Sequence, residues 1–197
     1  MHTQQLILLG IIIVGGVSVI GSYIYGFRTH PNSVNSLWGG ASKTLRLINL
    51  PFMILAAIGF IAFSYFILFH LNPEEVQIAN SFGFYLFHII FALILIPSAF
   101  WMPLTFAMIA RPKTSLWIGI RLTLAIVGIS SLALLLVLLY LNTNEPGLVY
   151  WFAVGGAVAF SIQTVLFDIF LWPIFFLPSL IRTGEISHSL TTSISGE

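Results

Sequence analysis

The chain has 197 residues, of which 58% are hydrophobic and only 7% are charged, and its mean hydropathy is +1.04. An ordinary soluble domain is about 25% charged, and a fold of this size cannot remove so much apolar surface from water. These proportions exclude a soluble enzyme, a disordered chain and a nucleic-acid-binding protein. The net charge of +1 indicates no polyelectrolyte partner, and the lack of cysteine excludes disulfides and thiolate metal sites. We therefore expect the lipid bilayer to be the solvent for most of the chain.

Five apolar runs are long enough to cross the hydrocarbon region, which takes about 20 residues of helix. They predict helices over about 5–27, 46–71, 79–110, 115–141 and 147–177. The first run is longer than the apolar region of a signal peptide, so we interpret it as a retained span. The runs do not alternate with period two, which favours an α-helical bundle over a barrel. The sequence thus predicts one all-α membrane domain over 1–181 and a polar, mobile tail over 182–197.

The charged residues predict the orientation of this bundle. With five spans, every basic residue falls on the side that holds the 28–45 loop, the 111–114 turn and the C-terminus. These residues are Arg28, Lys43, Arg46, Arg111, Lys113, Arg121 and Arg182. The opposite turns carry Glu74, Glu75 and Glu145 and no basic residue. The positive-inside rule then places the N-terminus outside and the C-terminus and basic loops in the cytoplasm.

Two ionisable residues lie inside the spans at similar depths. Asp168 is in the fifth span and Arg121 is in the fourth, both counted from the basic side. A charge in the hydrocarbon costs several kcal/mol, so such residues pair with one another or serve a ligand or proton pathway. We expect an intramembrane ion pair between Arg121 and Asp168. A structural role and a role in transport or ligand binding both stay open.

Other polar residues in the spans are candidates for a binding site. His88, in the third span, could ligate a tetrapyrrole, although an intramembrane histidine more often bonds to a neighbouring helix. Gln163 belongs to a polar patch in the fifth span, and Ser98 lies near the prolines of the third. Such groups either form interhelical hydrogen bonds or line a cavity between helices.

Trp101 differs from the other tryptophans of the spans. Trp117 and Trp151 fit the aromatic belt at the membrane interfaces, and Trp172 nearly does. Trp101 lies in mid-span, in the segment FWMPLTF. An indole at that depth needs a hydrogen-bond partner or a ligand against which it can stack.

The segment around Trp101 resembles the TspO family, which comprises the tryptophan-rich sensory proteins and the translocator protein. The third helix of that family carries a W-x-P-L/I-x-F run and then a basic turn that often ends in Arg-Pro. The matching residues here are Trp101, Pro103, Leu104, Phe106, Arg111 and Pro112. The five-helix count, the small size and a tryptophan that opens the fifth helix, Trp151, are also similar. The first loop keeps Pro31 and Trp38 of the family's longer loop motif.

The resemblance implies a dimeric bundle with a ligand pocket among its helices, closed by the first loop. The family binds porphyrins, haem-like tetrapyrroles and sterols. Carried over to this sequence, Trp38 would lie on the lid, and Trp101 and Pro103 in the pocket wall. Ser98, Phe106 and Gln163 complete the set of ligand-binding residues that we expect. Haem, a porphyrin or a chlorophyll-type pigment is then the candidate cofactor, alongside other hydrophobic small molecules.

Two other classes of function remain open. The 18 phenylalanines and the lack of a catalytic constellation also suit an accessory subunit of a larger membrane complex, one that binds pigment or lipid. A transporter that uses Arg121 and Asp168 is the third hypothesis. The sequence holds no glycine-rich phosphate loop, catalytic triad or paired carboxylates. It therefore gives no positive indication of an enzyme.

Overall fold

The computed structural model describes residues 1–31, 35–142 and 147–182, and these form helices and turns without a β-strand. Five helical spans are long and apolar enough to cross a membrane, which confirms the predicted number. The first four are α1 (Thr3–Thr29), α2 (Lys43–Phe69), α3 (Tyr85–Ala110) and α4 (Thr114–Leu139). The fifth is composed of α5 (Leu148–Ser161), the π-helix η3 (Ile162–Leu171) and α6 (Trp172–Arg182). The predicted mobile tail lies, beyond Arg182, outside the described residues.

The third helix begins at Tyr85 and not at residue 79 as predicted. Ile78 forms isolated bridges with Phe82 and Leu141, and this pairing ties the two turns at this end of the bundle together. Ala79 and Asn80 have positive φ angles of 50° and 56°, a left-handed conformation that a right-handed helix cannot include. Asn80, Ser81 and Gly83 are residues typical of turns, but Phe82 and Phe84 between and after them kept the segment within the predicted apolar run.

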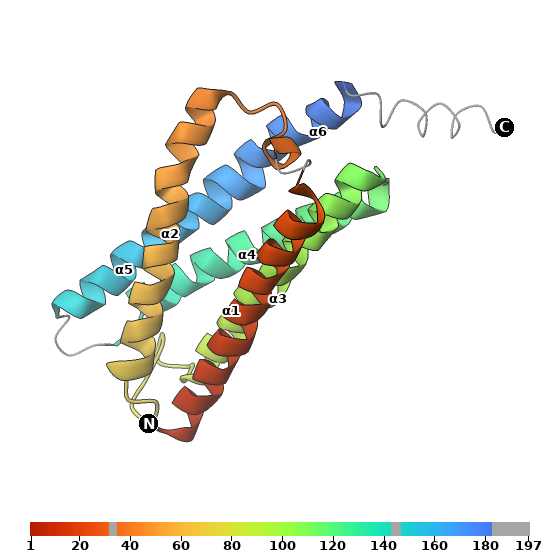
Figure 1. The fold of residues 1–197 in the computed structure, drawn as a ribbon. Coiled ribbons are helices and arrows are strands. Elements are labelled where there is room, and N and C mark those ends of the chain that lie inside the picture. The colour runs from red at the N-terminus through yellow and green to blue at the C-terminus, as the bar shows by residue number, and fades with distance from the viewer. Residues whose placement is uncertain (32–34, 143–146, 183–197) are drawn as a thin grey trace.

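The helices pack in an order that differs from their order along the chain. α1 packs on α3, α3 on α4, α4 on α5 and η3, and α5 on α2. Figure 1 shows α1 and α2 close together near the N-terminus and diverging toward the other end. We call the first end, with Glu74 and Glu75, the acidic end. The opposite end, with Lys43 and Arg111, is the basic end.

Gln5 joins α1 to α2 at the acidic end. Its Nε2 donates to the carbonyl oxygens of Leu68 and Leu71, at 2.8 and 3.1 Å. Its Oε1 accepts a hydrogen bond from the backbone N–H of His2 at 2.8 Å. Toward the basic end, the short helix η2 (Asn35–Trp38) lies against α3 and α6. The first and second spans are therefore joined at one end and separated along most of their length.

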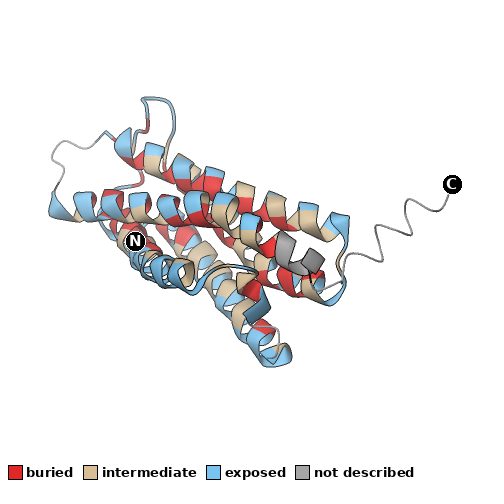
Figure 2. Cartoon of the chain, turned by 90° about the horizontal axis from the view of Figure 1, so that it is seen from above, coloured by how far each residue is buried: buried red, intermediate tan, exposed pale blue. Residues whose placement is uncertain are grey.

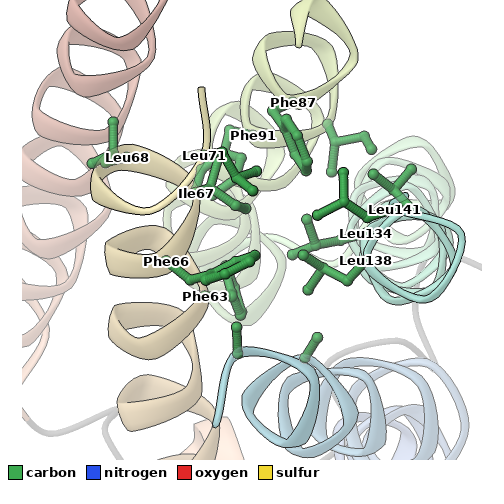
Figure 3. Packing of buried hydrophobic residues seen from close by; sticks show 14 of the residues in the cluster. Phe63, Phe66, Ile67, Leu68, Leu71, Phe87, Phe91, Leu134, Leu138 and Leu141 are labelled. Atoms are coloured by element: carbon green, nitrogen blue, oxygen red, sulfur yellow. The ribbon is translucent and has the colours of Figure 1, made fainter. Parts of the chain in front are cut away.

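The main hydrophobic core lies toward the acidic end, where α2, α3, α4 and α5 meet (Figure 3). Phe63 of α2 is fully buried, with its ring centroid 5.9 Å from that of Phe91 and 5.7 Å from that of Phe160. Leu134 and Leu138 of α4 close the core from the other side. The edge-on rings fill the space between helices without a polar atom, as expected where helices pack in lipid.

α2 and α5 cross with no side chain between them. A Cβ atom built on Gly59 would lie 2.4 Å from the carbonyl oxygen of Gly156. Only glycine permits so close an approach of two helix backbones, and small residues are enriched at such crossings in membranes. By contrast, the outward faces of the helices are apolar and exposed (Figure 2). α1 is the extreme case, since only Gln5, Leu8 and Gly26 of its residues are buried.

Candidate functional site

Gln163 and Asp168 face one another because the fifth span adopts a π-helix at this point. Gln163 Nε2 donates to Asp168 Oδ1 at 3.0 Å, across five positions of η3. In an α-helix of 3.6 residues per turn, residues five apart point to different sides. The wider turn of a π-helix brings them onto one face, and such segments are frequent at functional sites. The local backbone thus creates a polar pair inside an apolar span.

Gln163 has an unused acceptor. Its side chain is only 7% exposed, and its Oε1 is buried without a hydrogen-bond partner. Most buried polar atoms in native proteins have a partner, so a lone acceptor calls for an explanation. One such explanation is a ligand group that the site is built to receive.

Arg121 and Asp168 do not form the ion pair that we expected. Arg121 Nη1 instead donates to the backbone carbonyl oxygen of Ile169, the residue next to Asp168. Within the described residues, the one ion pair joins His2 and Glu74 at 3.3 Å, on the surface of the acidic end. The transporter hypothesis rested on an Arg121–Asp168 pair and loses that support.

Trp101 lies between two aromatic side chains from other elements. Its ring centroid is 5.8 Å from that of Tyr23 on α1 and 5.7 Å from that of Trp172, the first residue of α6. The indole N–H of Trp101 is buried and has no hydrogen-bond partner. The sequence predicted that this indole would need a partner or a ligand, and the protein supplies neighbouring rings but no acceptor.

Trp172 connects this group of rings to the first loop. Its Nε1 donates to the carbonyl oxygen of Leu37 in η2 at 2.8 Å. Its ring stacks on Phe176 at 4.3 Å. The backbone N–H of Gly40 also bonds the carbonyl oxygen of Phe175, at 2.9 Å. Trp172 was expected to lie at the membrane interface, so its contacts with Trp101 and with Leu37 were not predicted.

Tyr23 is a second residue that the sequence analysis missed. Its ring contacts Trp101, with centroids 5.8 Å apart, and Trp101 in turn contacts Trp172, which follows Asp168 by four residues. A tyrosine near the end of an apolar helix usually belongs to the interfacial belt, so its sequence position carried no sign of a site. We call the set Tyr23, Trp101, Gln163, Asp168 and Trp172 the aromatic–acid site. It combines three rings, one carboxylate and two unpartnered polar atoms.

The other predicted binding residues lie around this site or away from it. Phe106 is buried and stacks on His30, with ring centroids 4.7 Å apart. Ser98 is half-buried, and its hydroxyl donates to the carbonyl oxygen of Ile94 in its own helix at 2.6 Å. Pro103 is exposed on the outer side of α3, so it does not contribute to an internal wall.

Trp38 is half-buried at the end of η2, on the loop that was expected to form a lid. The guanidinium carbon of Arg46 lies 5.7 Å from the centre of its ring, a cation–π contact. Leu37, the preceding residue, packs in a small buried cluster with Met102 and Phe106. The loop is therefore fastened over the same region of α3 that carries Trp101.

His88 is engaged near the acidic end. Its Nε2 lies 2.8 Å from the carbonyl oxygen of Gln4, which ties the start of α3 to the start of α1. Because α3 begins at Tyr85, this histidine lies in the first turn of its helix and not deep in the span. Ligation of a tetrapyrrole by this nitrogen would require the bond to Gln4 to break. The contact matches the alternative that the sequence left open, a hydrogen bond to a neighbouring helix.

Two cavities open at the ends of the bundle. One of about 400 Å³ at the acidic end is lined by residues that include Phe66, His70 and Tyr150. One of about 350 Å³ at the basic end is lined by residues that include Arg111 and Lys113. Neither reaches the aromatic–acid site, where the close spacing of the rings leaves them packed on one another. A ligand bound there would have to move at least one ring.

Five apolar helical spans around an internal aromatic and acidic site define a multi-pass α-helical membrane protein. No known family, curated protein or solved structure matches the chain.

Proposed function

We propose that this protein binds a hydrophobic small molecule inside the membrane, at the aromatic–acid site. The observation that carries the proposal is the indole N–H of Trp101, which is buried without a hydrogen-bond partner among the described residues, on a ring that contacts Tyr23 and Trp172. A buried indole N–H normally has an acceptor, and leaving it without one costs about 1–3 kcal/mol. A ligand acceptor that reaches this N–H recovers that cost, while the rings bind the apolar body of the ligand.

The ligand reaches this site from the lipid. α1 and α2 diverge from their junction at Gln5 toward the basic end (Figure 1). Tyr23, Trp101 and Asp168 are each only half-buried. A molecule that partitions into the bilayer therefore has a path along the apolar surfaces of the helices and does not cross water. The η2 loop, fastened by Trp172, bounds the site on the basic side.

The resemblance to the TspO family makes a tetrapyrrole or a sterol the first ligand to examine. Trp38 and Leu37 lie on the loop that would act as the lid, and Trp101 lies where the family's motif is matched. A homodimer is part of the same proposal, because the family's bundle is dimeric. Among the predicted ligand-binding residues, Gln163 and Phe106 are buried, Trp38, Ser98 and Trp101 are half-buried, and Pro103 is exposed.

In the same proposal, the basic end of the bundle faces the cytoplasm and the N-terminus lies outside. Arg28, Lys43 and Arg46 lie at the ends of α1 and α2 there, and Arg111 and Lys113 at the turn between α3 and α4. Glu74 and Glu75 lie at the other end. The positive-inside rule then sets the orientation.

Equilibrium dialysis of the full chain in lipid nanodiscs, with empty nanodiscs as the blank, tests the binding proposal. Protoporphyrin IX and cholesterol are the two probes. We expect saturable binding of at least one probe, and an affinity lowered roughly tenfold in Trp101→Phe, which removes the N–H and part of the ring. Trp151→Phe is the matched control, because Trp151 is exposed on α5. Equal losses in both variants would contradict binding at Trp101, and binding of neither probe would contradict a tetrapyrrole or sterol as the ligand.

A second candidate function is that of an accessory subunit in a membrane complex. The specific observation is α1, which packs along α3 and leaves most of its apolar length exposed. Such a face suits either lipid or a helix of another protein. Extraction from the native membrane in a mild detergent distinguishes the two. A monodisperse particle of this chain alone would remove the subunit hypothesis.

A further inference from the structure

The aromatic–acid site has more acceptors than donors. Within the described residues, Asp168 receives one side-chain hydrogen bond, from Gln163 Nε2, although an ionised carboxylate has about four acceptor positions. Gln163 Oε1 is a further acceptor, buried and unpartnered. Both residues belong to one face of η3, so a single donor group can meet both. The arrangement suits a ligand that brings hydrogen-bond donors to this point.

Among the described side chains, no lysine or arginine forms an ion pair with Asp168. Arg121 lies near it along the bundle, but its Nη1 is held by the carbonyl oxygen of Ile169. Arg46 lies at the basic end, where its Nε donates to the carbonyl oxygen of Ala41. A carboxylate in the hydrocarbon region is costly unless a proton or a cation neutralises it. The site therefore gains from a bound positive charge.

The aromatic residues add a second feature that favours a cation. The Trp101 ring contacts both Tyr23 and Trp172, with ring centroids less than 6 Å apart, and Trp172 follows Asp168 by four residues. The face of an indole or phenol ring attracts a cation, and the attraction grows when water is excluded. Aromatic rings beside one carboxylate are the chemistry that recognises organic ammonium groups.

We propose that the aromatic–acid site selects a lipophilic amine: its ammonium N–H groups donate to Asp168 and Gln163 Oε1, and its apolar body lies on Trp101, Tyr23 and Trp172. The inference rests on the proposed function, since it names the chemical class of ligand for the same site. It also narrows the range of ligands for that function by their charge. The carboxylate groups of a porphyrin would be repelled by Asp168, so a ligand with a basic nitrogen is preferred over one with acidic groups.

A matched pair of compounds separates charge from shape. 4-Benzylpiperidine carries a secondary nitrogen that is protonated at neutral pH and then has two N–H groups, and benzylcyclohexane has the same shape without the nitrogen. Binding of both to the full chain in nanodiscs is measured by equilibrium dialysis, with empty nanodiscs to subtract lipid partitioning. We expect the amine to bind roughly tenfold more tightly than its carbon isostere, as a desolvated cation–π contact and a charged hydrogen bond allow.

Three variants assign that difference to Asp168. In Asp168→Asn, which keeps the shape of the side chain and leaves the rings in place, the preference for the amine should fall to the part that the cation–π contacts supply, and Asp168→Glu should keep more of the preference than Asp168→Asn does. Trp151→Phe should leave the preference intact. Each variant is first shown to be monodisperse and to unfold near the temperature of the parent protein.

The outcomes separate this inference from the proposed function. Equal binding of the two compounds to the parent protein, lost in Trp101→Phe, would overturn the amine inference and support a neutral ligand at the same site. A preference for the amine that is undiminished in Asp168→Asn would also overturn the inference. Binding of neither compound, together with failure of the porphyrin and sterol probes, would overturn the proposed function as well.

Discussion

Gln163 holds Asp168 through a hydrogen bond of 3.0 Å that spans five residues of the same helical segment. The bond runs along η3, and its geometry depends on the π-helical turn. A neighbouring contact fastens η3 to α4, where the hydroxyl groups of Ser131 and Thr164 lie 2.7 Å apart. The polar pair and this interhelical bond together fix the segment that carries the site.

The bond between Gln163 and Asp168 should contribute measurably to stability. Gln163→Leu removes the one side-chain donor to Asp168, and we expect a loss of about 1–3 kcal/mol because a buried acceptor is left without a partner. The thermal unfolding midpoint in detergent reports the effect.

The control is the double variant Gln163→Leu/Asp168→Leu. Replacement of both partners by apolar residues of similar size can be nearly neutral, so the double variant should recover most of the stability. A double-mutant cycle gives the coupling between the two residues. Additive effects of the two substitutions would show that the bond contributes nothing.

The crossing of α2 and α5 should tolerate no side chain at Gly156. A Cβ atom there would lie 2.8 Å from both the Cα and the carbonyl oxygen of Gly59, so Gly156→Val must push the helices apart. We expect a loss of about 1–3 kcal/mol, as for other overpacked sites, measured as a lower unfolding midpoint or yield. Gly155→Val is the matched control, because nothing lies within 4 Å of a Cβ at Gly155. Equal behaviour of these adjacent variants would contradict the crossing.

Gln5 should govern the contact between the first two spans at the acidic end. Gln5→Ala removes both donors to α2 and the acceptor for the backbone N–H of His2. We expect faster hydrogen exchange at the C-terminal turn of α2, with a cost of about 1–2 kcal/mol. Gln4→Ala is the control, since Gln4 is exposed and contacts His88 through its backbone oxygen. Unchanged exchange in Gln5→Ala would show that the junction is held by packing alone.

The proposed orientation can be tested cleanly because the chain has no cysteine. Ser81→Cys places a thiol at the acidic end and Ser115→Cys places one at the basic end, both at exposed positions. In intact cells, a membrane-impermeant maleimide should label Ser81→Cys and should label Ser115→Cys only after the membrane is permeabilised. The reverse pattern would place the basic end outside and invert the proposal.

The sequence allowed the number of spans to be predicted, because apolar runs of membrane length leave few alternatives. It did not reveal where α3 begins. Ala79 and Asn80 adopt a left-handed conformation, and Ala79 in particular carries no turn signal of the kind that glycine would give. Hydropathy averaged over a long window passes through this turn, because Phe82 and Phe84 flank it, although Asn80, Ser81 and Gly83 are residues typical of turns.

The site was predictable only in part. Trp101, Gln163 and Asp168 stood out because polar groups in mid-span are costly. The partners that these residues contact could not be predicted, because the position of a residue along a helix gives its depth in the membrane but not the direction in which its side chain points. Arg121 therefore reaches the carbonyl oxygen of Ile169, next to the expected partner. The π-helix adds roughly one residue per turn, and the three polar residues of this segment are too few to show the changed period in the sequence.

Trp172 belongs at once to the membrane interior and to the first loop. Its ring contacts Trp101, and its N–H holds Leu37 of η2. A molecule that displaces this indole from Trp101 must also disturb the bond to Leu37, because one rigid ring makes both contacts. Occupancy inside the bilayer is then transmitted to the membrane surface by a single side chain. Ligand binding beside Trp101 would thereby change the position of η2 at the basic end of the bundle, where another molecule can contact it.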